Sequence, residues 1–191
     1  MDTVTLTGYH GTSEDCVANI YASGFMPTTR SASWLGFGAY FSWEAPDRAI
    51  DWAKTVAARR SRKSGTTTKA ALFKVSVSLD NCMNLLDVGY WDLLRDAYRA
   101  VPNSLSQVGP GHLYNPSSYD LSKVGYNYRD CAAVNALVQN LENSGQPVDS
   151  IIAAFAEGNP VAADSWLFDQ STVMVNVRNP KRIKILGHTL F

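Results

Sequence analysis

A stretch with a strict two-residue period places the strongest constraint on the fold of this chain. From Ala71 to Leu79 every odd-numbered residue is apolar, whereas a lysine and two serines occupy most of the positions between them. This alternation is typical of a β-strand with one buried face. It recurs at Val4 to Gly8 and at Val173 to Val177, and Ile183 with Ile185 predicts a last strand after an Asn-Pro turn. The chain must therefore build a sheet.

Apolar residues at helical spacing predict helices between these strands. The predicted helices run from a Thr12/Asp15 capping box to Gly24, from Ala45 to about Ala58, from Leu93 to Val101, and from Val134 to Leu141 before Gly145. The apolar run Ile151 to Phe155 fits either a helix or a strand. Strands and helices do not alternate as βαβ units, and no repeat or linker divides the chain. We therefore expect one domain, residues 1–191, with an α+β sandwich fold.

Composition excludes several classes of protein. Seventeen Lys and Arg residues balance seventeen Asp and Glu residues, so no global charge attracts nucleic acid or an acidic membrane. Cys16, Cys82 and Cys131 are far apart and lack the spacing of a zinc site or a disulfide framework. The amino terminus lacks a signal-peptide pattern, and no uninterrupted apolar run is long enough to span a membrane. We expect a cytoplasmic protein, or one delivered into a target cytosol, without a metal or a membrane partner.

Two short motifs bring together residues suited to binding a flat ligand. The first is His10-Gly11-Thr12 at the end of the first predicted strand, where glycine leaves backbone N–H and C=O groups accessible. The second runs from Gly36 to Phe41 and ends in Tyr-Phe. It lacks the third glycine and the acidic residue of a dinucleotide-binding GxGxxG motif. Taken separately, the histidine also fits a packed ring bonded to a backbone carbonyl, and the second motif fits a glycine-rich turn.

Together the two motifs resemble those of the diphtheria-toxin-like and poly(ADP-ribose)-polymerase-like ADP-ribosyltransferases, and the order of elements extends the resemblance over most of the chain. The resemblance implies an ADP-ribosyltransferase-like split β-sandwich and NAD as co-substrate. It implies that His10 bonds the adenosine-side ribose, that the Gly11 backbone holds the nicotinamide amide, and that Tyr40 stacks on the ring. Thr12 and Gly38 would complete this wall, and Phe41 would point into the core.

The helix after Tyr40 supplies the opposite wall in this interpretation. Trp52 would form an aromatic sandwich with the cationic nicotinamide ring, although core packing explains it equally well. Many relatives place a small hydroxyl residue three positions before this aromatic, whereas this chain has Ala49. Ser42 or the backbone would then have to bond the amide.

The third motif of the family departs from its usual form here. Relatives carry a glutamate at the start of a late strand, and the best match in this chain is Gln170, with Asp169 and Thr172 as alternatives. A glutamine can bond a ribose hydroxyl but cannot act as a base. Glu157, beside a glycine in the preceding loop, is the further candidate for activating the acceptor.

The resemblance implies a mono-ADP-ribosyltransferase that modifies a nucleic acid or a protein and releases nicotinamide. Small cytosolic domains of this kind are similar to bacterial or phage toxins and defence enzymes, so an antitoxin or immunity protein is an expected partner. The alternatives are a non-catalytic binding module and an NAD glycohydrolase. The segment Arg59 to Lys69, rich in Arg and Lys, is expected to be a polar loop that either keeps the protein soluble or contacts phosphates.

Overall fold

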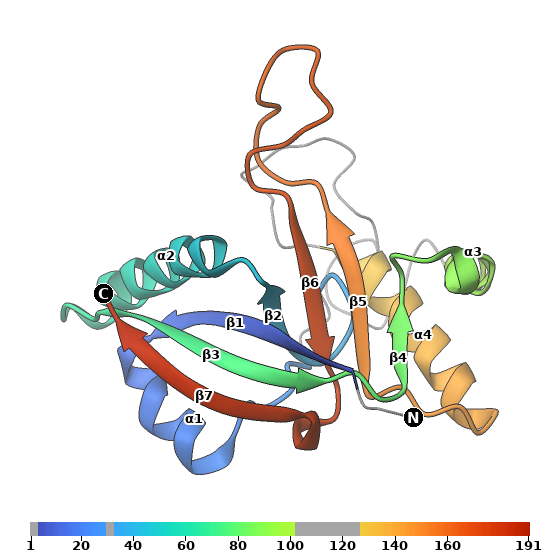
Figure 1. The fold of residues 1–191 in the computed structure, drawn as a ribbon, viewed down its shortest axis with the longest axis horizontal. Helices are drawn as coiled ribbons and strands as arrows, with labels where there is room; N and C mark the ends of the chain where they lie inside the picture. The colour runs from blue at the N-terminus through green and yellow to red at the C-terminus, as the bar shows by residue number, and fades with distance from the viewer. Residues whose placement is uncertain (1–3, 30–32, 102–126) are drawn as a thin grey trace.

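Seven strands form one mixed sheet in the computed structural model, which describes residues 4–29, 33–101 and 127–191. The strands are β1 (Thr5–Ser13), β2 (Ala39–Trp43), β3 (Ala70–Ser78), β4 (Cys82–Asn84), β5 (Ser150–Phe155), β6 (Thr172–Val177) and β7 (Ile183–Leu190). Their order across the sheet is β4-β5-β6-β2-β1-β3-β7, and only the β4–β5 pair is parallel. β5 and β6 run across the direction of β1, β3 and β7 (Figure 1). The predicted α+β class is confirmed.

Four α-helices flank this sheet within the described ranges. They are α1 (Val17–Ser23), α2 (Pro46–Ser64), α3 (Trp91–Ala100) and α4 (Tyr128–Asn143). α1 and α2 lie on opposite sides of the strands β1, β3 and β7, and α3 and α4 lie beside β4 (Figure 1). No helix in these ranges combines the length and the apolar character needed to cross a membrane.

Most of the predicted elements are present, and the strand with the strict two-residue period is β3. The apolar run Ile151 to Phe155, left open between helix and strand, belongs to β5. β2 and β4 were not predicted as strands. β2 has only five residues and follows a glycine-rich turn, and β4 has three, so neither shows a clear period. The stretch from Pro102 to Ser118 is rich in Gly, Pro, Asn and Ser, a composition that predicts a long surface loop, and it lies outside the described residues.

The prediction of a polar loop from Arg59 to Lys69 is wrong in its first half. α2 continues through the basic residues to Ser64 and ends at Gly65, whose φ of 74° places it in the left-handed region. Gly65 N–H donates to the Ser61 carbonyl, as in a glycine C-cap. Arg, Lys and Ala all favour helix, so charge at these positions marks an exposed helical face rather than a break.

The predicted capping box at Thr12 and Asp15 is also wrong. β1 continues to Ser13, and a 3₁₀ turn at Glu14–Cys16 separates it from α1. Neither the turn nor α1 receives a side-chain cap. The pairing of β1 with β3, which runs without a break to Ser13↔Ala70, keeps Thr12 in extended conformation.

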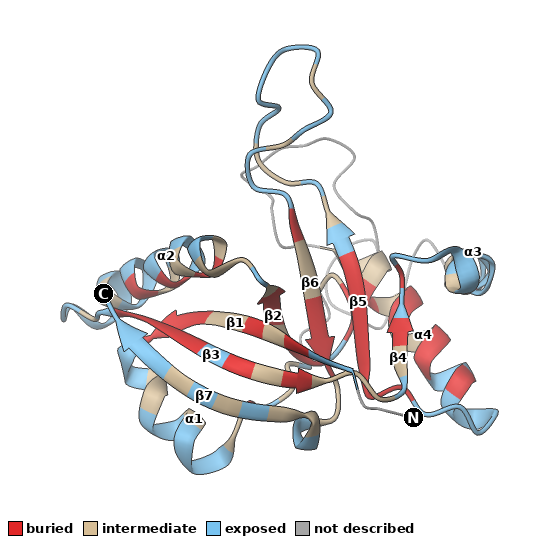
Figure 2. Ribbon diagram, viewed as in Figure 1, coloured by how far each residue is buried: buried red, intermediate tan, exposed pale blue. Residues whose placement is uncertain are grey.

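The two faces of the sheet carry separate cores. On one face α3 and α4 pack against β4 and β5 around Met83, Leu137 and Ile151. On the other face α1 and Phe25 pack against an aromatic and valine cluster that includes Phe41 and Phe73. Buried residues are concentrated on the inner strands, whereas β7 at the edge is half-buried or exposed (Figure 2). Because successive side chains of a strand point to opposite faces of the sheet, neighbouring residues belong to different cores.

A polar cluster ties three turns together at one end of the sheet, and we call it the Asp149 clasp. The Asp149 carboxylate accepts hydrogen bonds from Asn81 Nδ2 (3.0 Å), Asn179 Nδ2 (2.7 Å), and Nε and Nη2 of Arg182 (2.9 and 2.7 Å). Arg182 also pairs with Asp80. Burial raises the pKa of Asp149, but the bonds from Asn179, Asn81 and Arg182 outweigh it and hold the pKa below its usual range.

We predict that Asp149→Ala lowers the free energy of unfolding by about 2 kcal/mol at pH 7, because it leaves four donor nitrogens of three residues without their acceptor. The carboxylate's contribution is complete above its unfolded pKa of about 3.9 and is lost as the pH falls through the lower folded value. Urea unfolding at pH 7 and pH 3 measures both effects.

The matched control for this prediction is Asp92→Ala. Asp92 pairs with Arg95 one helical turn away on α3, and its side chain is 95% exposed. Its removal should leave the urea midpoint unchanged, because exposed pairs contribute little. If Asp149→Ala lowered the free energy of unfolding by no more than Asp92→Ala does, the structural role of the clasp would be contradicted.

Candidate functional site

His10 lies in β1 with its ring packed among aromatic side chains. The ring meets Phe25 edge-on at a centroid distance of 5.0 Å and Phe41 at 5.7 Å. His10 Nδ1 lies 2.8 Å from the backbone oxygen of Tyr40. Because a carbonyl oxygen can only accept, Nδ1 is the protonated ring nitrogen and donates the hydrogen bond. Burial lowers the pKa of His10, and the bond to Tyr40 offsets only part of that effect. The imidazole is therefore neutral near pH 7, and it joins β1 to β2.

Tyr40 directs its ring to the opposite face of the sheet, toward the core beneath α4. Its hydroxyl accepts a hydrogen bond from Leu35 N–H (2.9 Å) and donates one to the Gly36 carbonyl (2.7 Å). Burial raises the pKa of Tyr40 to about 12, so the hydroxyl stays protonated. Phe41 points the other way and is fully buried, as predicted. The second motif thus folds into a turn closed by its own tyrosine.

β1 and β2 separate immediately before the predicted NAD-binding edge. Backbone bonds from Leu79 N to Val4 O and from Glu14 N to Lys69 O, each 2.9 Å, show that even-numbered residues of β1 bond to β3. Successive residues of a strand direct their backbone N–H and C=O groups toward opposite neighbouring strands. Gly11 N–H and C=O therefore point toward the β2 side.

β2, however, reaches β1 only at Gly8 and Tyr9. No described residue of β2 pairs with β1 beyond Tyr9, so the Gly11 backbone faces an interval in the sheet rather than a paired strand. The bond from His10 to the Tyr40 carbonyl marks the point of separation. Just before β2, Gly38 forms an isolated antiparallel bridge with Thr28.

α2 covers this interval by packing tightly on Gly11. A Cβ on Gly11 would lie 2.0 Å from the Ala49 carbonyl oxygen and 2.8 Å from Ala53 N. Both contacts are with helix backbone, which cannot move aside as a side chain can. Ala49, Ala53 and Ala57 form a buried stripe along α2, and their small side chains permit this approach. The absence of a side chain at Gly11 is therefore required for packing whether or not a ligand binds there.

An ion pair connects the start of α2 to the β5–β6 hairpin. Arg48 Nη2 lies 3.0 Å from Glu157 Oε2, and the two side chains are only 24% and 15% exposed. Burial raises the pKa of Glu157, and Arg48 lowers it by a smaller amount, so the net shift is upward. Gln170 N–H donates to the Glu157 carbonyl (3.1 Å), which places these two candidates for the third motif side by side.

The other predicted site residues lie around this arrangement. Thr12 is buried in β1, and Thr172 is buried at the start of β6 opposite Phe155. Asp169 accepts from Asn159 N–H within the hairpin. Trp52 is 47% exposed on α2, where the Arg59 guanidinium lies over its ring at 5.2 Å.

Ser42, the predicted substitute for the missing hydroxyl at Ala49, is also placed by the structure. It is 6% exposed in β2, and its hydroxyl donates to Met174 Sδ at 3.7 Å. The Ser42 hydroxyl is therefore buried, with a weak acceptor as its partner.

Sequence reasoning missed the residues that hold the second motif in place. Asn176 is fully buried on β6 opposite Tyr40, and a Cβ on Gly38 would lie 2.0 Å from its Oδ1. Arg178 Nη1 donates to the Phe37 carbonyl (2.9 Å), and Phe37 N–H donates to Asn135 Oδ1 (3.0 Å). An asparagine inside an otherwise apolar strand was the available signal.

Arg48 was missed for a different reason. It is one of seventeen basic residues, and its partner Glu157 is 109 positions away along the chain. Only the fold brings the two together. The Nε atom of Arg48 is buried without a hydrogen-bond partner, so the guanidinium retains an unused donor.

None of the predicted site residues lines either of two surface cavities, of about 340 and 360 Å³. Within residues 4–29, 33–101 and 127–191, no three His, Cys, Asp or Glu side chains are grouped to hold a metal ion. At the predicted NAD-binding edge, α2 packs over the interval between β1 and β2.

Comparison with known proteins adds no further assignment. A scan against models of protein families and a search of curated proteins each found no match to this chain. The likeness to ADP-ribosyltransferases consequently rests on the motif residues alone and stays a prediction.

We predict that Gly11→Ala lowers the free energy of unfolding by about 2 kcal/mol, because the added methyl group forces α2 away from β1. Gly89→Ala is the matched control, since a Cβ there meets nothing within 4 Å. Thermal and urea unfolding of both variants measure the difference. Equal stability of the two variants would show that α2 does not pack on Gly11 as described.

Proposed function

We propose that this protein is a mono-ADP-ribosyltransferase that transfers ADP-ribose from NAD to a macromolecule. The observation that carries the proposal is a continuous series of contacts that joins the first motif, through the start of α2, to the third-motif segment. Gly11 touches Ala49 of α2, the neighbouring Arg48 pairs with Glu157, and Glu157 bonds the backbone of Gln170. This series supports an active site between the Gly11 edge of β1 and the β5–β6 hairpin, with an ADP-ribosyltransferase-like fold around it.

In this proposal the nicotinamide amide binds the Gly11 backbone, whose N–H and C=O face the interval between β1 and β2. A primary amide can donate one hydrogen bond to the Gly11 C=O and accept one from the Gly11 N–H. Access requires α2 or the hairpin to move, since Ala49 and Ala53 pack on Gly11. A movement of α2 relative to the hairpin would break the Arg48–Glu157 ion pair, whereas a movement of both together would preserve it.

The chemical step needs a group that stabilises the ribose cation and a group that accepts a proton. The bond between the ribose C1′ and the nicotinamide nitrogen breaks, nicotinamide leaves with the bonding pair, and the acceptor nucleophile bonds to C1′. Gln170 would bond a ribose hydroxyl without supplying negative charge. Glu157 would take the proton of the nucleophile, and its raised pKa makes it a better base than an ordinary glutamate.

A non-catalytic binding module is the second candidate function, and two observations favour it. The Tyr40 hydroxyl already has two partners within its own turn, and His10 Nδ1 is bonded to the Tyr40 carbonyl. Both motifs therefore have structural roles that need no ligand. Simple hydrolysis of NAD differs from transfer only in the nucleophile, which would be water.

We predict that Gln170→Glu raises the rate of nicotinamide release from NAD by about tenfold, because a carboxylate stabilises the oxocarbenium-like transition state more than an amide does. The assay incubates protein with NAD and a cell lysate, and mass spectrometry measures nicotinamide, free ADP-ribose, and modified protein or nucleic acid. Gln139→Glu, on the exposed face of α4, controls for added charge. Absence of NAD cleavage in both wild type and Gln170→Glu would favour the binding module.

The same assay reports the acceptor class and the role of α2. Arg59 lies over Trp52, and Arg60 pairs with Asp15, so these two basic residues already have contacts within the protein. If the acceptor is a nucleic acid, neutralising the basic end of α2 should weaken modification and its salt dependence while sparing NAD hydrolysis. If it is a protein, modification should be unchanged.

We predict that the acid limb of the pH–rate profile lies above the pKa of an ordinary glutamate, about 4.3, because burial raises the pKa of Glu157. Activity should fall as the pH drops through that raised value, where the carboxylate becomes protonated. In Glu157→Gln the rate should be low and the limb absent. An unchanged limb in Glu157→Gln would assign it to another group.

A further inference from the structure

The smaller of the two surface cavities lies at the β4 edge of the sheet, and none of the motif residues lines it. It has a volume of about 340 Å³, within the range of small-molecule sites, and is formed by β4, the end of α4 and the segment that leads into β5. Met83, Leu141 and Val148 supply walls that are 1%, 7% and 7% exposed. These residues belong to the core beneath α4, so that side of the cavity is fixed by the fold.

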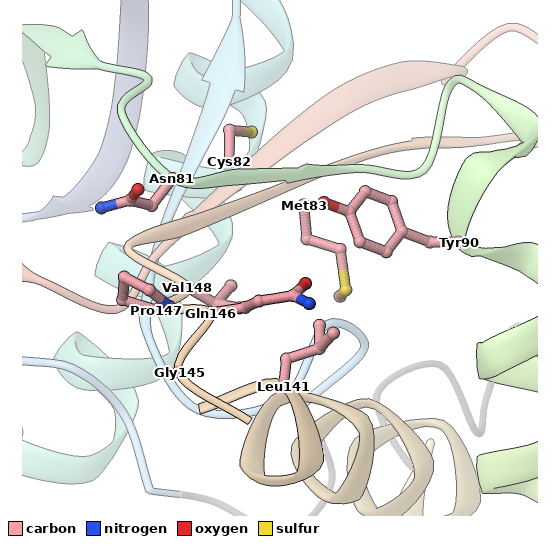
Figure 3. Close-up of a pocket in the computed structure, with 9 residues that line it drawn as sticks. All are labelled: Asn81, Cys82, Met83, Tyr90, Leu141, Gly145, Gln146, Pro147 and Val148. Carbon is pink, nitrogen blue, oxygen red and sulfur yellow. The ribbon is translucent and has the colours of Figure 1, made fainter. Parts of the chain in front are cut away.

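Two polar side chains converge on this space without partners. Figure 3 shows the Gln146 amide and the Tyr90 hydroxyl both directed toward the Met83 side chain, with Leu141 beneath them. Within the described ranges neither side chain forms a hydrogen bond. An amide and a hydroxyl that face an apolar wall can each donate and accept. They therefore supply orienting polar contacts beside the apolar wall formed by Met83, Leu141 and Val148.

The end of α4 holds Gln146 in this position. Gly145 has a φ of 80°, and its N–H donates to the Glu142 carbonyl, while Gln146 N–H donates to the Leu141 carbonyl (2.9 Å). These two bonds are the pair found when a glycine ends a helix in the left-handed region. The backbone of Gln146 is thus fixed, and its side chain is left to reach over the cavity.

The cavity offers no charge to a ligand. Its lining residues are all uncharged: Asn81, Cys82, Met83, Tyr90, Leu141, Gly145, Gln146, Pro147 and Val148. Asp149, which follows Val148 in sequence, already accepts hydrogen bonds from Asn81 and Arg182, and Asn81 turns its amide toward that carboxylate. A phosphate would find no cationic side chain among these lining residues. The lining therefore favours an uncharged ligand, and it shares no residue with the proposed active site.

We propose that this cavity binds an uncharged, single-ring compound that carries a carboxamide. The ring would lie against Met83, Leu141 and the Tyr90 ring, and the carboxamide would exchange hydrogen bonds with the Gln146 amide. A thioether and an aromatic face both pack well on a flat ring. The site does not depend on the proposed transferase function.

The test uses 2-phenylacetamide and its acid, phenylacetate, which share a ring and a linker but differ in charge. The protein carries ¹³C-methyl methionine, and the Met83 methyl resonance reports occupancy. Met26, which is 72% exposed, is the internal control. We expect phenylacetamide to shift the Met83 resonance saturably and to raise the melting temperature, with no response to phenylacetate.

Variants assign the polar contacts. Gln146→Ala should weaken phenylacetamide binding by about fivefold through loss of one hydrogen-bonding partner. Gln139→Ala, on α4 outside the cavity, should leave binding unchanged. A Met83 resonance that responds equally to both probes would overturn the proposal. So would a lack of saturation within the solubility of phenylacetamide, or unchanged binding by Gln146→Ala.

Discussion

The contact between α2 and Gly11 is the constraint on which the centre of this structure depends. The helix backbone comes so close to β1 that a single methyl group would overlap the Ala49 carbonyl. That approach needs glycine on the strand and alanines along the helix, and it fixes the direction in which α2 leaves β2. Arg48 then reaches the β5–β6 hairpin, and the first helical turn connects distant segments of the chain.

The separation of β1 from β2 follows from the same packing. β1 stays paired with β3 to Ser13, whereas β2 leaves it after Tyr9. A sheet that opens in this way exposes backbone groups, and burying them without partners is costly. His10 satisfies the Tyr40 carbonyl, and Thr28 pairs with Gly38. Gly11 is the position where the backbone still faces the opening, which is why we place ligand recognition there.

The features of the fold that could be predicted from the sequence are those encoded by neighbouring residues. The period of β3 and the opposite directions of Tyr40 and Phe41 could be inferred, because alternation is a property of neighbouring residues. The end of α2 was placed too early because basic residues were taken for a loop, although Gly65 was the local stop signal. β4 was too short to show a period. The Asp149 clasp and the Arg48–Glu157 pair join residues far apart in sequence, and no local pattern reports such contacts.

In the proposed active site, one chemical role would be divided between two residues. Gln170 would take the position where a transferase needs charge, and the neighbouring Glu157 would supply a carboxylate, whose burial favours its protonated form. Arg48 opposes that effect and keeps the carboxylate oriented. An acid held by a guanidinium is well positioned but less available as a base, since the pair must loosen before a proton can be accepted. Any turnover by this site would therefore be coupled to movement of the hairpin relative to α2, and slow chemistry would be the expected cost of that coupling.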